Sequence, residues 1–273
     1  METAEKLNKL KEYIKDLGSL AVGFSGGVDS SFLLAVAHEV LGDKAIAVTG
    51  MDAGVPQREK EEAVRFCRER GIRHIIREVN PFKEEEYRHN GPKRCYYCKK
   101  GMFTELKKVA EENGITHIAE GSNMDDLGDY RPGLQAAEEL GVKCPLREAG
   151  LTKSEIRELS KEMGLPTWSK PAYACLASRF VYGEEITEEK LHKIDRAEQF
   201  LIEQGFLEER VRVHGDLARI EVPEKDISRL ASDVVRIAVY EEFKKIGFPF
   251  VTIDMRGYRM GSMNATIKEN KES

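Results

Sequence analysis

A glycine-rich turn near the N-terminus carries the residue types that phosphate binding requires. The turn is Gly23-Phe24-Ser25-Gly26-Gly27-Val28-Asp29-Ser30-Ser31. The apolar run at residues 20–22 predicts a buried strand before it, and residues 31–37 predict a helix after it. A helix start directs free backbone N–H groups and the positive end of the helix dipole at an anion. Ser25 and Ser30 add hydroxyl donors and Asp29 can hold Mg²⁺, but no Walker lysine follows the turn.

A second turn is rich in carboxylates. It is Glu120-Gly121-Ser122-Asn123-Met124-Asp125-Asp126, directly after an expected strand at residues 116–120. The carboxyl ends of parallel strands meet at one edge of a sheet, so we expect this turn to lie near the first one. Asp29 and Asp126 are the predicted Mg²⁺ ligands there, since Mg²⁺ prefers oxygen ligands. An ordinary turn rich in Asn and Asp is the alternative.

Three of the five cysteines are candidates for chemistry. Cys95 and Cys98 form a C-x-x-C pair, and Cys175 lies in a loop between two predicted domains. The pair alone is compatible with a redox site, half of a zinc site or two cluster ligands. Together with Cys175, it could hold a 4Fe–4S cluster that leaves one iron open. We interpret Cys67 and Cys144 as small apolar core residues.

The elements that position these residues alternate between strand and helix. Apolar runs predict parallel strands at residues 20–22, 45–49, 72–79, 116–120 and 142–146. Helical spacing and end signals predict helices at residues 4–17, 31–37, 56–70 and 100–113, one within 129–140, and one from a capping box at 152–155. This order favours an α/β fold, a doubly wound parallel sheet with helices on both faces.

The pattern changes after about residue 180. A helix at 187–204, a hairpin with alternating apolar residues near 211–213 and 220–222, a long helix at 226–246 and a strand at 250–255 follow. We therefore predict a first domain at residues 1–180 and a smaller α+β domain at residues 181–273.

Composition narrows the class of protein. The chain has 273 residues and a net charge of −5, so no overall basic field favours nucleic acid. No apolar run approaches the roughly 20 residues that span a bilayer. The N-terminus lacks a secretory pattern, and we expect a cytoplasmic protein with reduced thiols.

The phosphate turn has a known counterpart. Ser25-Gly26-Gly27-Val28-Asp29-Ser30 resembles the SGGxDS signature of the PP-loop ATP pyrophosphatases, of the adenine nucleotide alpha hydrolase-like fold. These enzymes split ATP between its α and β phosphates and leave AMP on an acceptor oxygen. The resemblance implies that Gly121 helps to bind ATP, because its turn is similar to the family's G-T-N-x-D-D segment. It places the adenine at Thr49, Gly50 and Met51.

Three further segments tighten the resemblance. Residues 170–179, 128–133 and 257–264 are similar to segments of the LarE sulfur transferases, and the likeness extends almost to the C-terminus. Family members adenylate a carboxylate of pyridinium-3,5-biscarboxylic acid mononucleotide and convert it to a thiocarboxylate, in making the nickel-pincer cofactor of lactate racemase. The cysteine that matches Cys175 either gives up its own sulfur or joins a C-x-x-C in holding a 4Fe–4S cluster. With Cys95 and Cys98 present, this chain resembles the second kind.

The implied substrate carries a phosphate, which needs cations. Arg210 and Arg212 share one face of a predicted strand, and Arg256 and Arg259 flank the last motif. We predict that these four arginines bind the substrate phosphate. The resemblance also implies sulfide or another sulfur donor, a homo-oligomer, and neither nucleic acid nor membrane as a partner.

Three other functions compete with this one. A tRNA thiolase can also join a PP-loop to three cluster cysteines, but would bind RNA with strong salt dependence. A synthetase of the amidotransferase type would use ammonia and need no cysteine. A nucleotide-sensing or cluster-carrying protein would bind ATP without releasing pyrophosphate.

Overall fold

The computed structural model describes residues 2–128, 132–171, 174–259 and 261–264. By their contacts the residues form two compact units. The first comprises Met1–Pro81 and Lys93–Tyr173, and the second comprises Phe82–Pro92 and Ala174–Ser273. No helix in the described part of the chain is long and apolar enough to cross a membrane.

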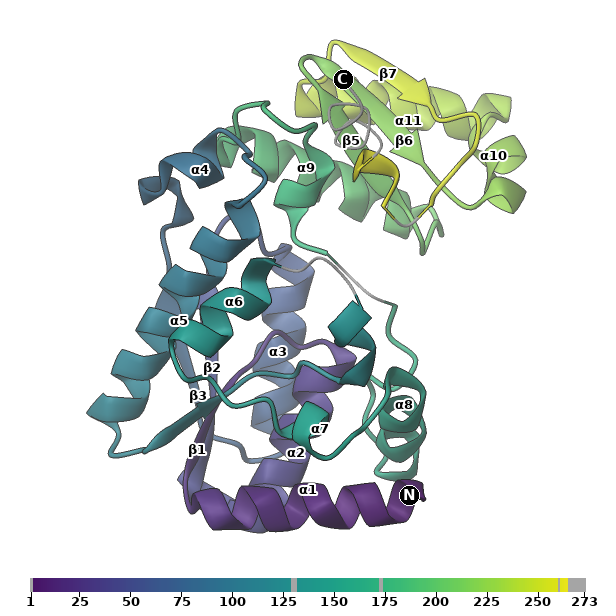
Figure 1. The fold of residues 1–273 in the computed structure, drawn as a ribbon. Coiled ribbons are helices and arrows are strands. Elements are labelled where there is room, and N and C mark those ends of the chain that lie inside the picture. Colours follow the sequence, from purple (N-terminus) through teal and green to yellow (C-terminus); the bar gives the residue numbers. More distant parts are fainter. Residues whose placement is uncertain (1, 129–131, 172–173, 260, 265–273) are drawn as a thin grey trace. The chain divides into compact units, whose positions relative to one another are not determined.

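The first unit is built on a four-stranded parallel sheet (Figure 1). Its strands are β1 (Leu20–Gly23), β2 (Ala45–Met51), β3 (His74–Glu78) and β4 (His117–Ala119). The strand order is β3-β2-β1-β4. The chain runs outward from β1 to β3 and then returns to the other side of β1. The carboxyl ends of β1 and β4 therefore flank the switch point where sheets of this kind bind ligands.

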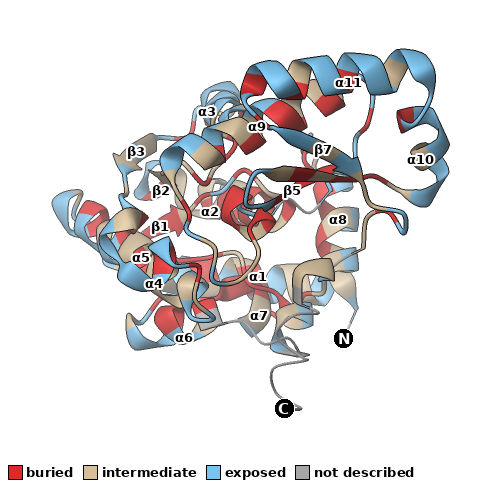
Figure 2. Ribbon diagram, turned by 90° about the horizontal axis from the view of Figure 1, so that it is seen from above, coloured by how far each residue is buried: buried red, intermediate tan, exposed pale blue. Residues whose placement is uncertain are grey.

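Helices cover both faces of this sheet, as predicted (Figure 1). They are α1 (Thr3–Leu17), α2 (Val28–Leu41), α3 (Gln57–Glu69), α5 (Arg94–Glu112), α6 (Pro132–Glu139), α7 (Pro145–Glu148) and α8 (Lys153–Glu162). The side chains of β1 alternate: Leu20 and Val22 pack with α1, α2 and α8, whereas Ala21 packs with α5 and α6. Figure 2 shows α2 as largely buried, which fits its nearly continuous apolar sequence.

Two predictions for the first unit are wrong. Residues 142–146 form no strand: Lys143 makes a single parallel bridge to Ala119, and Pro145 then begins α7. Proline lacks an N–H for a strand ladder but suits the first position of a helix. The helix expected from residue 100 already begins at Arg94, so the C-x-x-C pair lies inside α5 and not before it.

The second unit is a small α+β assembly. Its elements are α4 (Glu85–Arg88), α9 (Glu188–Glu203), β5 (Arg210–His214), β6 (Leu217–Glu221), α10 (Glu224–Leu230), α11 (Asp233–Ile246) and β7 (Phe250–Ile253). The predicted hairpin is confirmed, because β5 and β6 pair in antiparallel fashion. β7 lies parallel to β6, which gives the order β5-β6-β7.

Short 3₁₀ turns occur along the described chain, at Gly42–Lys44, Pro81–Lys83, Met124–Gly128, Leu176–Arg179 and Ser262–Asn264.

The single long helix expected at residues 226–246 is wrong. It is divided into α10 and α11 at Ser232, whose backbone is extended and whose hydroxyl donates to Arg229 O at 2.7 Å. Ser232 makes no side-chain cap on α11, and its hydroxyl instead bonds the last turn of α10, so the break has a local cause. Residues 82–92 join the second unit because buried Asn90 donates to Phe180 O at 3.3 Å and to Val181 O at 2.6 Å.

Candidate functional site

The glycine-rich turn joins β1 to α2 and leaves the first turn of that helix without a side-chain cap. The Ser25 and Ser30 hydroxyls lie 3.0 Å apart, and the Gly27 N–H donates to Ser25 Oγ at 3.4 Å. Gly26 has a φ of +71°, a conformation that favours glycine. The uncapped N–H groups of a 14-residue helix and two hydroxyls therefore converge on one anion site.

The Asp29 carboxylate faces a lysine that the sequence analysis missed. Lys153 Nζ lies 2.5 Å from Asp29 Oδ2, and the Lys153 backbone N–H donates to Asp125 Oδ2 at 2.8 Å. α8 thus supplies at the phosphate loop the cation that a Walker loop carries in its own sequence. One feature of the sequence could have pointed to Lys153: it is the first residue of a predicted helix that begins at this edge of the sheet.

One oxygen of Asp29 is suited to a metal ion. Asp29 Oδ1 is buried and has no hydrogen-bond partner among the described residues. A buried carboxylate oxygen without a donor is costly unless a ligand uses it. No three His, Cys, Asp or Glu side chains in the described ranges converge on a metal position, so most Mg²⁺ ligands here would be phosphate oxygens and water.

The second turn packs directly against the first. A Cβ on Gly121 would lie 2.9 Å from Ser30 N, so only glycine allows this approach. Asp126 Oδ2 accepts from the Asn123 N–H at 2.9 Å, inside the 3₁₀ turn that follows. The structure therefore brings Gly121 to the start of α2, while Asp126 closes its own turn. Its role as a Mg²⁺ ligand stays a prediction.

The capping box that begins α8 holds Lys153 in place. The Thr152 N–H donates to Glu155 Oε2 at 2.9 Å, and Lys6 Nζ lies 2.7 Å from Glu155 Oε1. Burial raises the pKa of Glu155, but the Lys6 ammonium and the Thr152 donors outweigh it and lower the pKa to about 2.

Replacing Glu155 by glutamine should lower the free energy of unfolding by about 2 kcal/mol at neutral pH, allowing for its partial exposure. The pKa of Glu155 is lower in the folded state, so its contribution is present above the ordinary value of 4.5. That contribution is lost as the pH falls from there toward about 2. Urea unfolding at several pH values measures the difference. Glu158→Gln, on the exposed side of α8, is the matched control. A difference that does not change with pH would contradict this account.

At the end of β2, where the adenine is predicted, Thr49 is held by hydrogen bonds and Gly50 is crowded by its neighbours. Thr49 is buried, and its hydroxyl bonds Phe24 O and His74 Nε2, each at 2.7 Å. Burial lowers the pKa of His74, which favours the neutral ring at pH 7. Gly50 is crowded, since an added Cβ would lie 3.1 Å from Val79.

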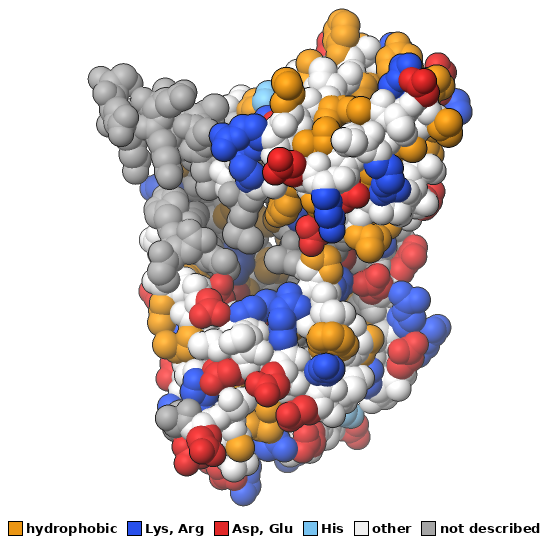
Figure 3. Space-filling view, turned by 90° about the vertical axis from the view of Figure 1, so that its right-hand side faces the viewer, with side chains coloured by type: hydrophobic (Ala, Val, Ile, Leu, Met, Phe, Trp, Pro, Cys, Tyr) orange, Lys and Arg blue, Asp and Glu red, His pale blue; other side chains and the backbone are white. Residues whose placement is uncertain are grey.

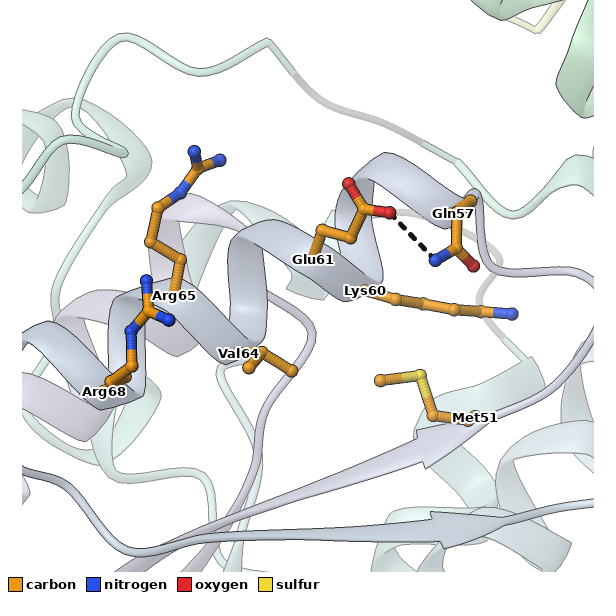
Figure 4. Close-up of a pocket in the computed structure, with 7 residues that line it drawn as sticks. All are labelled: Met51, Gln57, Lys60, Glu61, Val64, Arg65 and Arg68. Atoms are coloured by element: carbon orange, nitrogen blue, oxygen red, sulfur yellow. Dashed lines mark hydrogen bonds between the residues drawn. The ribbon is translucent and has the colours of Figure 1, made fainter.

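Beside the end of β2 is a hollow of about 360 Å³. It lies between Met51 and the outer face of α3 (Figure 4). Its lining residues are Met51, Gln57, Lys60, Glu61, Val64, Arg65 and Arg68. Of the three residues predicted to bind adenine, Met51 alone lines this hollow, and Thr49 instead fixes the strand to the phosphate loop.

The C-x-x-C pair lies in the first turns of α5 in the first unit. Cys95 is exposed and Cys98 is half-buried, and residues three apart share one face of a helix. The Arg94 guanidinium lies 3.6 Å from Cys95 Sγ and places a cation beside this sulfur. Two accessible thiols on one helix face suit two neighbouring ligands of a cluster.

Cys175 lies in the second unit, exposed, immediately before the 3₁₀ turn Leu176–Arg179. Arg179 is fully buried and donates to Ala174 O at 2.7 Å and to Cys175 O at 3.3 Å. Its other nitrogens bond both oxygens of buried Glu198, at 2.8 and 2.9 Å. Burial lowers the pKa of Arg179, but Glu198 outweighs this and raises it. A permanent buried cation therefore holds the backbone that presents the Cys175 thiol.

The other two cysteines are core residues by position. Cys67 and Cys144 are both buried. Burial raises the pKa of the Cys67 thiol to about 12 and that of Cys144 to about 11. Neither is a nucleophile at neutral pH, because the thiolate is the reactive form.

The four arginines predicted to bind a phosphate have unequal surroundings. Arg212 is buried and ion-paired to Glu221 at 2.9 Å, and buried Arg210 stacks over the Tyr258 ring at 5.0 Å. Arg256 is exposed, and Arg259 Nη1 lies 3.9 Å from Asp254. All four belong to the second unit, and Glu221 already offsets the charge of Arg212.

Comparison with known proteins agrees with the fold and the phosphate site. A family model for NAD synthase matches residues 2–108. An uncharacterized protein of Synechocystis is 40% identical over 96% of this chain and 98% of its own length. The pyridinium-3,5-bisthiocarboxylic acid mononucleotide synthase of Lactiplantibacillus plantarum is 36% identical over 97% of this chain and 95% of that enzyme. A tRNA-specific 2-thiouridylase of Rickettsia conorii is 29% identical over 56% of this chain.

The parallel sheet, the SGGxDS turn after β1 and the matching family model define a PP-loop enzyme that uses ATP. The identity over nearly the whole length is more specific. The chain belongs to the LarE family, and it is an ATP-dependent sulfurtransferase.

Proposed function

We propose that this enzyme adenylates a carboxylate of pyridinium-3,5-biscarboxylic acid mononucleotide and converts it to a thiocarboxylate, in the synthesis of a nickel-pincer nucleotide cofactor. The observation that carries the proposal is the 36% identity to the L. plantarum synthase over nearly both whole chains. The phosphate site and the exposed Cys175 supply the two kinds of group that the reaction needs.

In the first step the substrate carboxylate attacks the α-phosphorus of ATP, and the bond to the β-phosphate breaks. The N–H groups at the start of α2, the Ser25 and Ser30 hydroxyls and the Lys153 ammonium would stabilise the charge that develops on pyrophosphate. Mg²⁺ held by Asp29 Oδ1 would neutralise further phosphate charge. The product is an acyl adenylate, whose AMP is a good leaving group.

In the second step a sulfur nucleophile displaces AMP. If Cys175 is that nucleophile, its thiolate forms a thioester with the substrate carbonyl as the bond to AMP breaks. Loss of the Cα proton of Cys175 then breaks its Cβ–S bond. This leaves a thiocarboxylate on the substrate and dehydroalanine at position 175, with no oxidant required.

The alternative source of sulfur is a 4Fe–4S cluster held by Cys95, Cys98 and Cys175. Cys95 and Cys175 are exposed and Cys98 is half-buried, and both members of the pair face the same side of α5. Bound there, a cluster with three protein ligands would offer one open iron site to sulfide.

Replacing Cys95 or Cys98 by alanine should abolish binding of the cluster, because a site with three protein thiolates loses a third of its ligands. Cluster binding is measured by the iron and sulfide content after anaerobic reconstitution and by the visible absorption of the iron–sulfur cluster. Cys144→Ala, which removes a buried thiol of raised pKa, is the control and should keep its iron. Full iron content in either pair variant would refute the three-cysteine site.

The reaction itself is tested by anaerobic turnover with MgATP, sulfide and the biscarboxylated mononucleotide. Pyrophosphate and thiolated product are assayed in the same tube, and the intact chain is weighed by mass spectrometry. A chain that loses the mass of one H₂S as product forms has given up the Cys175 sulfur. Product with an unchanged chain mass indicates delivery through the cluster. No thiolated product would refute the proposal.

The remaining parts of the proposal concern partners. We expect Arg210, Arg212, Arg256 and Arg259 to bind the substrate phosphate. Sulfide or another donor would supply the sulfur. Copies of the chain are expected to form a homo-oligomer. RNA is not expected as a partner. On the face drawn in Figure 3, acidic and basic side chains of the described residues are interspersed, without the continuous basic surface typical of RNA binding.

A further inference from the structure

Lys170 ends against the phosphate loop, from a position 144 residues away in the chain. Its side chain is 12% exposed. Its Nζ donates to Gly26 O at 3.2 Å, to Glu59 Oε2 at 2.7 Å and to Glu62 Oε2 at 2.6 Å. An ammonium has three donors, so these three contacts use all of them.

The backbone at Lys170 is also fixed. Arg157, on α8, donates to Trp168 O at 2.6 Å and to Lys170 O at 2.8 Å, and the Lys170 N–H donates to Thr167 O at 3.0 Å. The side chain therefore reaches the loop from a rigid turn of the same unit, anchored to α8 by Arg157 and to α3 by the two glutamates.

The contact with Gly26 O sets the direction of a loop N–H group. The Gly26–Gly27 peptide is trans, so its C=O and N–H point in opposite directions. An ammonium that holds the Gly26 carbonyl outward keeps the Gly27 N–H directed into the loop, where it meets Ser25 Oγ at 3.4 Å. Gly26 has no Cβ to restrict its rotation, so without Lys170 this peptide would be freer to turn.

We propose that Lys170 is the positioning residue of the phosphate loop: it orients the Gly26–Gly27 peptide so that the Gly27 N–H meets a phosphate of ATP. It also neutralises Glu59 and Glu62, two carboxylates that would otherwise repel a nucleotide at this loop. The proposal deepens the ATP-binding step and is independent of the sulfur chemistry.

Direct titration with ATP, without the carboxylate substrate, tests this. Lys170→Met keeps most of the length of the side chain but removes its charge and donors, and should weaken ATP binding about tenfold or more. The triple variant Lys170→Met, Glu59→Gln, Glu62→Gln removes the carboxylates that would repel ATP. The Gly26–Gly27 peptide still lacks the donor that orients it, so the affinity for ATP should stay low. Lys170→Arg keeps donors at this position and should recover part of the affinity.

The matched control is Lys161→Met, because Lys161 lies over the Trp168 ring at 5.0 Å and does not touch the loop. Thermal unfolding shows whether each variant keeps its fold, and emission of Trp168, the single tryptophan, reports on the turn in the Lys170 variants. ATP affinity at the wild-type level in Lys170→Met would overturn the proposal. So would full recovery in the triple variant, which would assign the effect to charge alone. Wild-type protein that binds ATP without forming thiolated product would refute the proposed function and leave this inference standing.

Discussion

Replacing Cys175 by alanine should abolish thiolated product while pyrophosphate release from ATP continues. The expected loss of sulfur transfer is at least about 1000-fold, as for enzymes that lose a nucleophile. Adenylation should persist because the phosphate site belongs wholly to the first unit, whereas Cys175 lies in the second. Parallel assays of pyrophosphate and of thiolated product, in single turnovers with MgATP and sulfide, separate the two steps.

Cys67→Ala is the matched control for this experiment. Its thiol is buried, with a pKa of about 12, so the variant should transfer sulfur normally once corrected for any loss of folded protein. Sulfur transfer that survives in Cys175→Ala would remove this residue from the chemistry. It would favour an enzyme that uses free sulfide without a protein thiol.

Replacing Asp29 by asparagine should lower the rate of pyrophosphate release at least about 100-fold. The change keeps the shape of the side chain but removes the negative charge that faces Lys153 and that makes the unpartnered Oδ1 suited to Mg²⁺. The fold should survive, because this side chain is 23% exposed and lies in the first turn of α2. Pyrophosphate release measured across a Mg²⁺ titration should show both a lower rate and a weaker response to the metal.

Asp43→Asn provides the comparison, since this exposed carboxylate lies in the 3₁₀ turn after α2, away from the loop. It should release pyrophosphate at the wild-type rate. Normal release in Asp29→Asn, with an unchanged Mg²⁺ dependence, would show that the metal is held elsewhere. The Lys153–Asp29 ion pair would then be a structural contact.

Much of the fold could be predicted because its signals are local. The continuous apolar runs of β1 and β2, the strand–turn–helix order at the phosphate loop and the capping box at Thr152 each depend on neighbours along the chain. The errors arose where one residue overrides a pattern. Pro145 ends the expected fifth strand, and Ser232 divides a helix whose apolar spacing continues.

The sequence by itself determined the class of enzyme and the place of the phosphate loop, because these depend on short motifs whose residue types carry their function. The chemical roles of its three candidate cysteines stay predictions. Only the tertiary structure decided what surrounds them. Lys153 meets Asp29 across 124 residues, Lys170 meets Gly26 across 144, and Arg212 is paired with Glu221 inside a folded sheet. Such contacts produce no recurring pattern in the sequence, since each needs only one suitable side chain at a position that the fold brings close to its partner.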